Sequence, residues 1–359
     1  MTNLRTQFPV FERYTYLNTA SSGLMYKDLL AHRAQLDQKF MEGGSVFRNS
    51  VYEDLERVKT TLTEVFNCPQ DRISLVPNAS LGLNATLEAF AKGQRVLLLE
   101  SDYPSLVWPF QSRDFECRMI TQNGLSEESL MMAIRQHQPR ILAVSLVQWE
   151  NGMVITPFFL STLKKHFPDL IIIADGTQFL GTTLFDFDKS GIDLLMASTY
   201  KWLCAGYGNG LLFFSPQLIN LLQPKTTGYN TFRSAEKSTK PLVTRYFEPG
   251  HLDYMSFESL KFSVAYFSKV GFDVIQQRIS GLMRSACSQL QAAGFSLNTT
   301  QHPIHASGII SVKAPERIIH FLEANNIICS YRNGLRVSMH AYNNEEDLSR
   351  LMSALRNYS

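Results

Sequence analysis

Two apolar segments of the chain each run directly into residues that could do chemistry. Ile171–Ala174 leads into Asp175 within IIIADGTQ, and Leu194–Ala197 leads into Ser198 and Lys201 within LLMASTYKW. In open α/β sheets, ligands bind at the carboxyl ends of the strands. A carboxylate buried there is unfavourable unless a positive group pairs with it. Considered singly, Asp175 could equally cap a helix or open a turn, and Lys201 could be a solvated lysine.

A third segment, VPNASLG (76–82), follows an apolar run and opens an amphipathic one. Free backbone N–H groups at the start of a helix, with Asn78, Ala79 and Ser80 around them, could bind a phosphate group. An ordinary helix N-cap formed by Asn78 or Ser80 explains the same pattern.

Taken together, the three segments meet the requirements of one cofactor. Pyridoxal phosphate (PLP) needs an amine that forms an imine, an acid that keeps its pyridine nitrogen protonated, and an anion site for its phosphate. Lys201, Asp175 and the turn at 78–80 would supply these groups. We therefore expect a PLP enzyme that holds its cofactor as a Schiff base on Lys201.

The segments that must position these residues alternate between short apolar runs and amphipathic stretches. Continuous apolar runs separated by helices are typical of a mainly parallel sheet that is covered on both faces. We expect an α/β large domain over residues 21–250. Its strands are predicted at 72–76, 95–99, 141–146, 170–174, 194–197 and 210–214, and its helices at 80–91, 126–136 and 157–166.

The pattern changes beyond about residue 247. We expect a smaller α+β C-terminal domain over residues 251–359, with residues 1–20 packing against it. Its helices are predicted at 256–293, 315–325 and 344–356, and its strands at 308–312, 327–331 and 335–338.

Composition and charge exclude several classes of function. The net charge is +2, which gives no electrostatic reason to expect nucleic acid or an anionic membrane as a partner. The apolar runs are too short to span a bilayer, and residues 1–20 resemble neither a signal nor a transit peptide. The five cysteines are widely spread without a CxxC pair, which argues against disulfides and a zinc site. We expect a cytoplasmic protein without a metal.

Over nearly its whole length the chain resembles the class V aminotransferases of PLP fold type I. This family includes cysteine desulfurases, selenocysteine lyases, kynureninases and isopenicillin-epimerase-like proteins. The resemblance rests on YLNTASSG (16–23), NAS (78–80), DGTQ (175–178), STYKW (198–202) and LRVSMHAYNNEED (335–347). It implies a seven-stranded-type sheet, and a homodimer whose active sites lie at the subunit interface.

The resemblance also implies individual roles around the cofactor. Lys201 would be the imine lysine and Asp175 the partner of the pyridine nitrogen. Gln178 would lie near the phenolic oxygen of the ring, and Tyr103 would stack on the ring, although simple packing explains Tyr103 as well. The residues implied around the phosphate are Asn78, Ala79, Ser80 and Ser198.

Arg336, inside the apolar strand LRVSMH, is unfavourable to bury unless it meets a carboxylate. The resemblance implies that it binds the α-carboxylate of an amino-acid substrate; a structural ion pair with an internal acid is the alternative. Asn18 and Thr19 resemble an N-terminal loop that faces the same pocket. His251 stands where relatives often carry Thr in a phosphate loop that spans the dimer, so its role stays open.

Two departures from the cysteine desulfurases bear on the reaction. Cys329 lies in an apolar run and not on a mobile loop, and Tyr200 stands where desulfurases commonly have His. We therefore do not expect a persulfide-forming desulfurase. As a general base, Lys201 serves transamination, elimination and epimerisation alike.

The expected function is that of a class V aminotransferase acting on a small amino acid. A β-eliminating C–S or C–Se lyase or an epimerase is the alternative within the PLP enzymes. Two other classes stay open, namely a catalytically silent binding protein and a nucleotide-binding α/β protein. The chain shows neither GxxxxGK[ST] nor GxGxxG to support nucleotide binding.

Overall fold

The computed structural model describes residues 2–121, 125–232, 240–298 and 307–358. Its main feature is a seven-stranded sheet in the order β2-β8-β7-β6-β5-β3-β4. Only β8 runs antiparallel to its neighbours, β2 and β7. The mainly parallel sheet expected from the sequence is therefore confirmed. Its strands are β2 (Ile73–Val76), β3 (Gln94–Leu99), β4 (Phe115–Ile120), β5 (Ile141–Ser145), β6 (Ile171–Asp175), β7 (Leu194–Ser198) and β8 (Gly210–Phe214).

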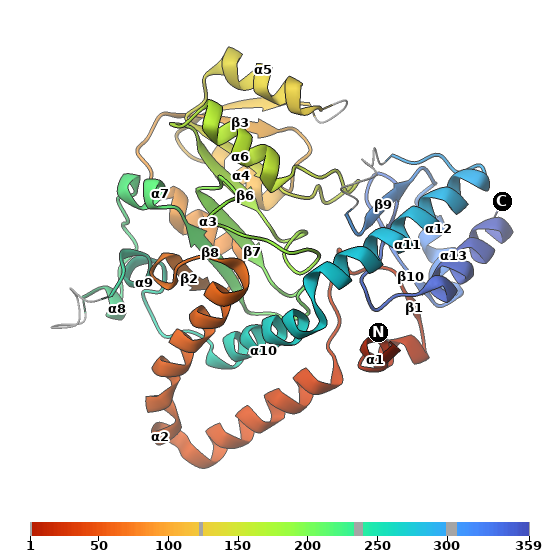
Figure 1. Ribbon diagram of the computed structural model, residues 1–359, viewed down its shortest axis with the longest axis horizontal. Helices are drawn as coiled ribbons and strands as arrows, with labels where there is room; N and C mark the ends of the chain where they lie inside the picture. The colour runs from red at the N-terminus through yellow and green to blue at the C-terminus, as the bar shows by residue number, and fades with distance from the viewer. Residues whose placement is uncertain (1, 122–124, 233–239, 299–306, 359) are drawn as a thin grey trace.

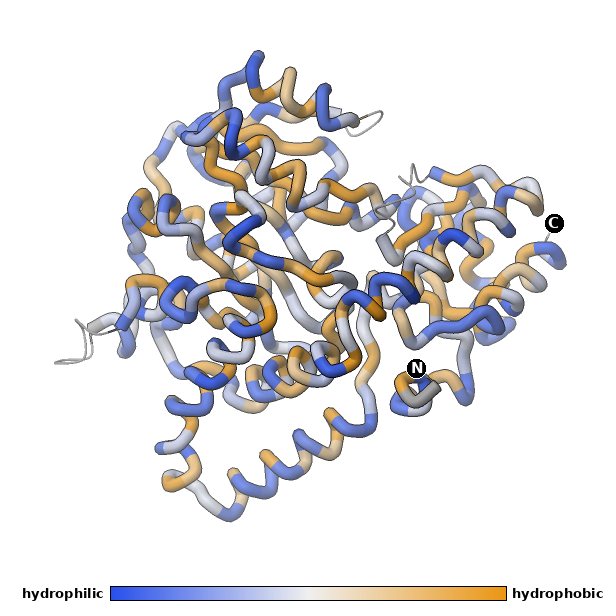
Figure 2. The backbone as a smooth tube through the Cα atoms, in the orientation of Figure 1, coloured by the Kyte–Doolittle hydropathy of each residue, from blue (hydrophilic) through white to orange (hydrophobic). Residues whose placement is uncertain are grey.

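Both faces of the sheet are covered, which explains the continuous apolar runs of its central strands. In β5, Leu142 and Val144 join one hydrophobic cluster, whereas Ile141 and Ala143 join a second one. Because successive side chains of a strand point to opposite faces, the two clusters lie on either side of the sheet. Figure 2 shows the central strands as predominantly hydrophobic. The helices between the strands are α3 (Ala79–Leu87), α4 (Pro104–Gln111), α5 (Glu127–His137) and α6 (Pro157–His166), with η2 (Gln70–Arg72) before β2. Three further helices follow β8, namely α7 (Pro216–Leu221), α8 (Tyr229–Phe232) and α9 (Leu242–Phe247).

A second, antiparallel sheet has the order β11-β12-β9 and lies to one side of the large sheet (Figure 1). It is formed by β9 (Ile309–Val312), β11 (Ser330–Tyr331) and β12 (Leu335–Ser338), with α11 (Phe272–Ala292), α12 (Ile318–Ala324) and α13 (Glu345–Tyr358) beside it. One hydrophobic cluster contains both Ile172 of β6 and Ile310 of β9, so the two sheets share a core. The domain boundaries expected at residues 20 and 250 stay predictions.

The beginning of the chain packs against its end. β1 (Thr15–Tyr16) pairs in parallel with β10 (Ile327–Ile328), after α1 (Thr2–Thr6) and η1 (Pro9–Glu12). Arg5 binds Asp347 of α13 through an ion pair of 2.7 Å between Nη1 and Oδ2. Figure 1 shows both termini on the side of the smaller sheet.

Several elements were not expected from the sequence, among them β4, α4 and the long helix α2 (Lys27–Phe66). β4 is the edge strand, and its residues alternate between exposed and half-buried, so it lacks a continuous apolar run. α2 is largely exposed and kinks at Gly44, with φ 48° and ψ −121°; in Figure 1 it projects from the body as two arms. The single helix expected at 256–293 is two helices, because Gly271 (φ 93°) separates α10 (Tyr254–Val270) from α11.

Candidate active site

A small cavity lies at the carboxyl ends of β5, β6 and β7. Because β6 and β7 are adjacent and parallel, Asp175 at the end of one strand and Lys201 just beyond the other reach the same edge. The structure thus brings four of the expected residues together around one space. The lining residues are Tyr103, Ser145, Val147, Trp149, Asp175, Thr177, Gln178 and Lys201.

Lys201 is not the solvated surface lysine of the simpler interpretation. Its side chain is buried, and Nζ lies 5.6 Å from the ring centroid of Tyr103 and 5.7 Å from that of Tyr200. Burial lowers the pKa of Lys201 to about 8; Asp175 opposes this shift, and Arg336 reinforces it. At pH 7, about a tenth of the molecules of an amine with this pKa are neutral, whereas the neutral fraction of an ordinary lysine is below about one in a thousand. The site therefore holds a nucleophilic amine at neutral pH.

Asp175 is buried at the end of β6, and its Oδ1 accepts a hydrogen bond of 2.8 Å from the backbone N–H of Thr177. The turn that the simpler interpretation placed at Asp175 is therefore present. Burial raises the pKa of Asp175, although Thr177 and Lys201 oppose the shift. A protonated pyridine nitrogen would supply the positive partner that such a carboxylate lacks.

The turn at 78–80 is anchored to β7. Asn78 is the N-cap of α3, because its Oδ1 accepts a hydrogen bond of 2.9 Å from Leu81 N. Ala79 N donates to Ser198 Oγ over 2.9 Å, which leaves the Ser198 O–H free to donate to an anion. Ser198 N in turn donates to Thr177 Oγ1, a residue of the cavity wall. The turn lies beside the cavity wall without forming part of it.

Gly210 allows the turn to approach the sheet. A Cβ atom at this position would lie 3.0 Å from Asn78 Cα and 2.8 Å from the carbonyl oxygen of Ala197. The backbone of the turn therefore rests directly on β8, where a side chain would displace it.

Arg336 is buried in β12 without a carboxylate partner among the described residues. Its Nε donates to Ser330 Oγ over 3.1 Å, Nη1 to the carbonyl oxygen of Trp149 over 2.6 Å, and Nη2 to Ser21 Oγ over 2.6 Å. Burial lowers its pKa to about 10, and the nearby Arg332 contributes. A buried cation supported only by neutral oxygens is suited to binding an anion. The alternative of a structural ion pair does not apply within the described chain.

The N-terminal segment contacts the backbone around Lys201. Gly23 N donates to the carbonyl oxygen of Tyr200 over 3.1 Å, and a Cβ atom at Gly23 would overlap the carbonyl oxygen of Lys201. Asn18 forms a bridge to Ser338 of β12, and its Oδ1 is buried without a hydrogen-bond partner.

Three further residues singled out in the sequence lie outside the cavity wall. The hydroxyl of Thr19 lies 2.6 Å from that of Tyr342 in the core. His251 Nε2 lies 3.1 Å from Nη2 of the α2 residue Arg48, on the surface. Cys329 is buried, and burial raises the pKa of its thiol to about 12. In the described part of the chain, no cluster of His, Cys, Asp and Glu could hold a metal ion, and no helix is long and apolar enough to cross a membrane.

Several residues of the site were not recognised from the sequence. Ser145 ends β5 and Trp149 follows it, so the strand-end argument that singled out Asp175 would have found them. Asp102 is buried and accepts hydrogen bonds from Ser145 N, Ser145 Oγ and Tyr103 N, at 2.8, 2.5 and 2.7 Å. It fixes the turn that carries Tyr103 to the end of β5. Its position directly before Tyr103 in ESDYPSLVW was the available signal.

The chain is similar to known proteins along most of its length. The uncharacterized aminotransferase YcbU of Bacillus subtilis (strain 168) is 20% identical over 353 residues, which are 96% of this chain and 94% of that protein. The apo structure of a cysteine desulfurase from Thermococcus onnurineus NA1 superposes with a TM-score of 0.90 at 16% identity, covering 99% of this chain and 97% of that one. The cystine C-S lyase C-DES, in complex with its product cysteine persulfide, gives a TM-score of 0.87 at 18% identity, over 97% and 99% of the two chains.

These two structures confirm fold type I, which the sequence predicted. The family model described as "Aminotransferase class-V" matches residues 32–351, which is most of the chain. The chain therefore belongs to the class V aminotransferase family, and its cofactor is pyridoxal phosphate.

Proposed function

We propose that this protein is a PLP-dependent aminotransferase that acts on a small amino acid. The observation that carries this proposal is the arrangement of a buried amine with a lowered pKa, Lys201, a buried carboxyl, Asp175, and a buried guanidinium without an acidic partner, Arg336. These groups suit the aldehyde of the cofactor, its ring nitrogen and the carboxylate of a substrate, respectively.

When bound, PLP supplies an electron sink for the negative charge that develops at the α-carbon of an amino acid. Lys201 Nζ would hold the cofactor and would serve as the base for the α-proton of the substrate. Asp175 would pair with the protonated ring nitrogen. Tyr103 would cover the ring, and Gln178 would donate a hydrogen bond to the phenolic oxygen.

The remaining polar residues hold the two anionic groups. Ser80 and Ser198 would bind the phosphate, and Ala79 N, which donates to Ser198 Oγ, would hold that hydroxyl in place. Asn78 acts indirectly, because it caps α3 and thereby fixes this backbone. Arg336 orients the substrate carboxylate, and the unpartnered Oδ1 of Asn18 accepts a hydrogen bond from the substrate.

A β-eliminating C–S lyase is the second candidate. The similarity in fold to the cystine C-S lyase C-DES favours it. Elimination needs the same base, ring-nitrogen partner and carboxylate site as transamination, and requires no cysteine nucleophile. The buried Cys329 is therefore compatible with both candidates, but not with a reaction that stores a persulfide on this thiol.

We also propose that the protein is a cytoplasmic homodimer. α2 carries the large apolar side chains Leu30, Phe40, Met41 and Val46, which are 54% to 78% exposed. Exposed apolar side chains concentrated on one element are typical of an interaction surface. All five cysteines are free thiols, which suits a reducing compartment. A molar mass of one chain by light scattering would contradict the dimer.

The reaction is tested with the purified holoenzyme and individual amino acids. We expect a visible absorption band that Lys201→Ala abolishes, a change of this band with an amino acid, and its restoration by a keto acid. Pyruvate formed without a keto acid, together with sulfide from cysteine or cysteine persulfide from cystine, would identify the lyase instead. Absence of the lysine-dependent band would contradict both candidates.

A further inference from the structure

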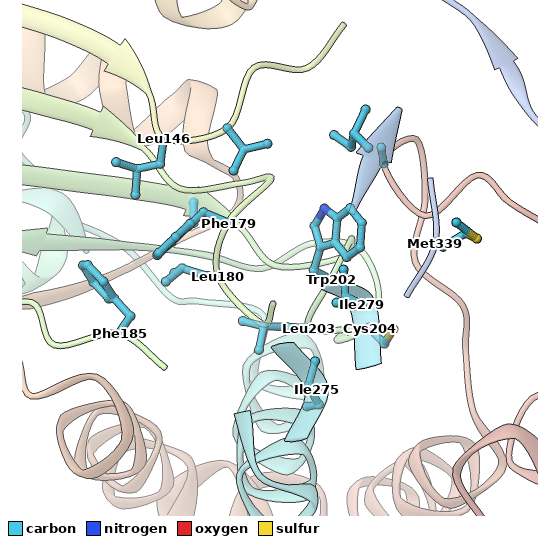
Figure 3. Packing of buried hydrophobic residues seen from close by; sticks show 14 of the residues in the cluster. Leu146, Phe179, Leu180, Phe185, Trp202, Leu203, Cys204, Ile275, Ile279 and Met339 are labelled. Carbon is cyan, nitrogen blue, oxygen red and sulfur yellow. The ribbon is translucent and has the colours of Figure 1, made fainter. Parts of the chain in front are cut away.

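The residue after the lysine, Trp202, is one of the most enclosed large side chains of the molecule, with 1% of its surface exposed. In Figure 3 its indole lies within the hydrophobic cluster, with Phe179 and Leu180 on one side and Met339 on the other. A Cβ atom at Gly308, just before β9, would overlap the indole ring. Trp202 therefore connects the loop that carries Lys201 to the smaller sheet, and its position is fixed by close packing.

The indole nitrogen of Trp202 contacts the side chain of Gln178. Nε1 donates a hydrogen bond of 2.7 Å to Gln178 Oε1, while Gln178 Nε2 donates one of 2.9 Å to the carbonyl oxygen of Ala20. An indole N–H can only donate and a carbonyl oxygen can only accept. Both contacts thus require the same orientation of the Gln178 amide. In the flipped amide, the NH₂ group would face the Trp202 N–H and the oxygen would face the Ala20 carbonyl oxygen, so both hydrogen bonds would be lost.

This orientation determines what Gln178 offers to the cavity. An amide nitrogen has two N–H groups, and one of them is used by Ala20 O. Gln178 lines the cavity together with Lys201 and Asp175. The group left for a ligand there is the second N–H, which is a hydrogen-bond donor.

We propose that Trp202 is a positioning residue whose indole N–H fixes the Gln178 amide, so that its free N–H donates to the phenolic oxygen of the cofactor ring. The inference rests on the function proposed above and adds a residue to it. Trp202 itself touches neither the ring nor the substrate. It acts only through the orientation of Gln178.

His340 holds Trp202 from the other side. The imidazole stacks on the indole with centroids 5.8 Å apart, and Nε2 lies 3.0 Å from the carbonyl oxygen of Trp202. Since a carbonyl accepts, Nε2 carries the proton. Burial lowers the pKa of His340 to about 4, so this support stays neutral around pH 7. Lys201, Asp175 and Tyr103 are the titratable residues that line the cavity. The other charged and titratable groups that act on Lys201 or on its neighbour Tyr200 are Arg332, Arg336 and Tyr207.

A donor at the phenolic oxygen has a measurable consequence. The hydrogen bond stabilises negative charge on this oxygen and so weakens its hold on the proton that it shares with the Lys201 nitrogen. The pH midpoint of the visible absorption band is therefore lowered. One hydrogen bond corresponds to a shift of roughly one pH unit.

The test is a pH titration of the visible band in the holoenzyme and in Trp202→Phe, which keeps an aromatic ring but removes the N–H. We expect the midpoint to rise by roughly one pH unit in Trp202→Phe. Trp108→Phe is the matched control, because Trp108 is 66% exposed on α4, and its midpoint should equal that of the wild type. Should Trp202→Phe fail to fold, β-(3-benzothienyl)alanine at position 202 replaces only the N–H by sulfur.

A double-mutant cycle with Gln178→Leu separates positioning from packing. If Trp202 acts through Gln178, then Trp202→Phe shifts the midpoint no further in the Gln178→Leu background. A wild-type midpoint in Trp202→Phe, or a shift that adds fully to that of Gln178→Leu, would overturn the inference. A wild-type protein without a lysine-dependent band would instead overturn the proposed function.

Discussion

Arg336 Nη1 donates to the backbone carbonyl oxygen of Trp149 over a distance of 2.6 Å. The guanidinium is thereby held by the main chain that follows β5, whereas a carboxylate would neutralise it. The same contact connects the smaller sheet, which carries Arg336, to the cavity wall, of which Trp149 is a part.

Replacement of Arg336 by lysine should mainly weaken substrate binding. The planar guanidinium of arginine can donate to its three oxygen partners and still form two hydrogen bonds to a carboxylate. Lysine lacks this geometry. Since hydrogen bonds to charged groups contribute about 1.5–3 kcal/mol, we expect kcat/KM to fall by roughly 10- to 150-fold, mostly through KM. Steady-state kinetics of Arg336→Lys check this, with the exposed Arg317→Lys as control. An unchanged KM would show that the substrate carboxylate binds elsewhere.

The rate at which the apo-protein captures PLP should depend on the protonation of Lys201. Its lowered pKa of about 8 means that the reactive neutral amine increases up to that pH and then levels off. The capture rate is measured by stopped-flow absorbance between pH 6 and pH 10, at intervals of about half a pH unit, and gives the pH midpoint of its increase. A rate that still rises steeply at pH 10 would mean an ordinary lysine.

Arg332→Gln should move this midpoint to higher pH. The Arg332 cation is one of the groups that lower the pKa of Lys201, so removing it favours the protonated amine. Arg135→Gln, on the exposed side of α5, serves as control. A midpoint that moves to lower pH, or does not move, would contradict the electrostatic contribution of Arg332.

The buried ion pair between Lys59 of α2 and Glu248 should matter for stability and not for chemistry. Lys59 Nζ lies 3.0 Å from Glu248 Oε1, and both side chains are almost completely buried. Lys59→Met leaves an uncompensated buried carboxylate, so the free energy of unfolding should decrease by about 3–5 kcal/mol in urea denaturation. The double variant Lys59→Met, Glu248→Gln should recover much of this loss. Lys189→Met, at the surface pair with Asp186, should change the free energy of unfolding far less.

Cys329→Ser should retain most of the activity. Burial raises the pKa of this thiol to about 12, so almost no thiolate exists at neutral pH. In the native wild type, a thiol reagent should leave Cys329 unmodified, as mass spectrometry of peptides would show. Loss of activity in Cys329→Ser together with a persulfide on Cys329 would mean that a desulfurase mechanism operates after all.

The strands that position the site were predictable because they are buried on both faces. The five residues of β6 and of β8 are all buried, and their continuous apolar runs were recognised within one residue of their bounds. Asp175 and Lys201 were recognised because polar residues interrupt such runs. Elements that are exposed on one side, such as β4 and α2, carry no such signal and were missed.

The partners of the site residues could not be predicted in this way. The contacts of Arg336 come from Ser21, Trp149 and Ser330, which are separated from it by up to 315 positions. Similarly, the sequence indicated no role for Trp202 beyond its position next to Lys201. Its hydrogen bond to Gln178 depends on how the loops after β6 and β7 pack. Sequence spacing determines which residues end a strand, whereas tertiary packing determines what they contact.

The pairing of β1 with β10 sets the order in which the protein can mature on the ribosome. Residues 15–23 are synthesised long before their partners at 327–328 and at Ser338. Until then the N-terminal segment has no edge to pair with, and the peptide bonds around Lys201 lack one of their neighbours. Such distant pairings form late. Capture of the cofactor by a nascent chain should therefore wait until residues 327–338 have emerged.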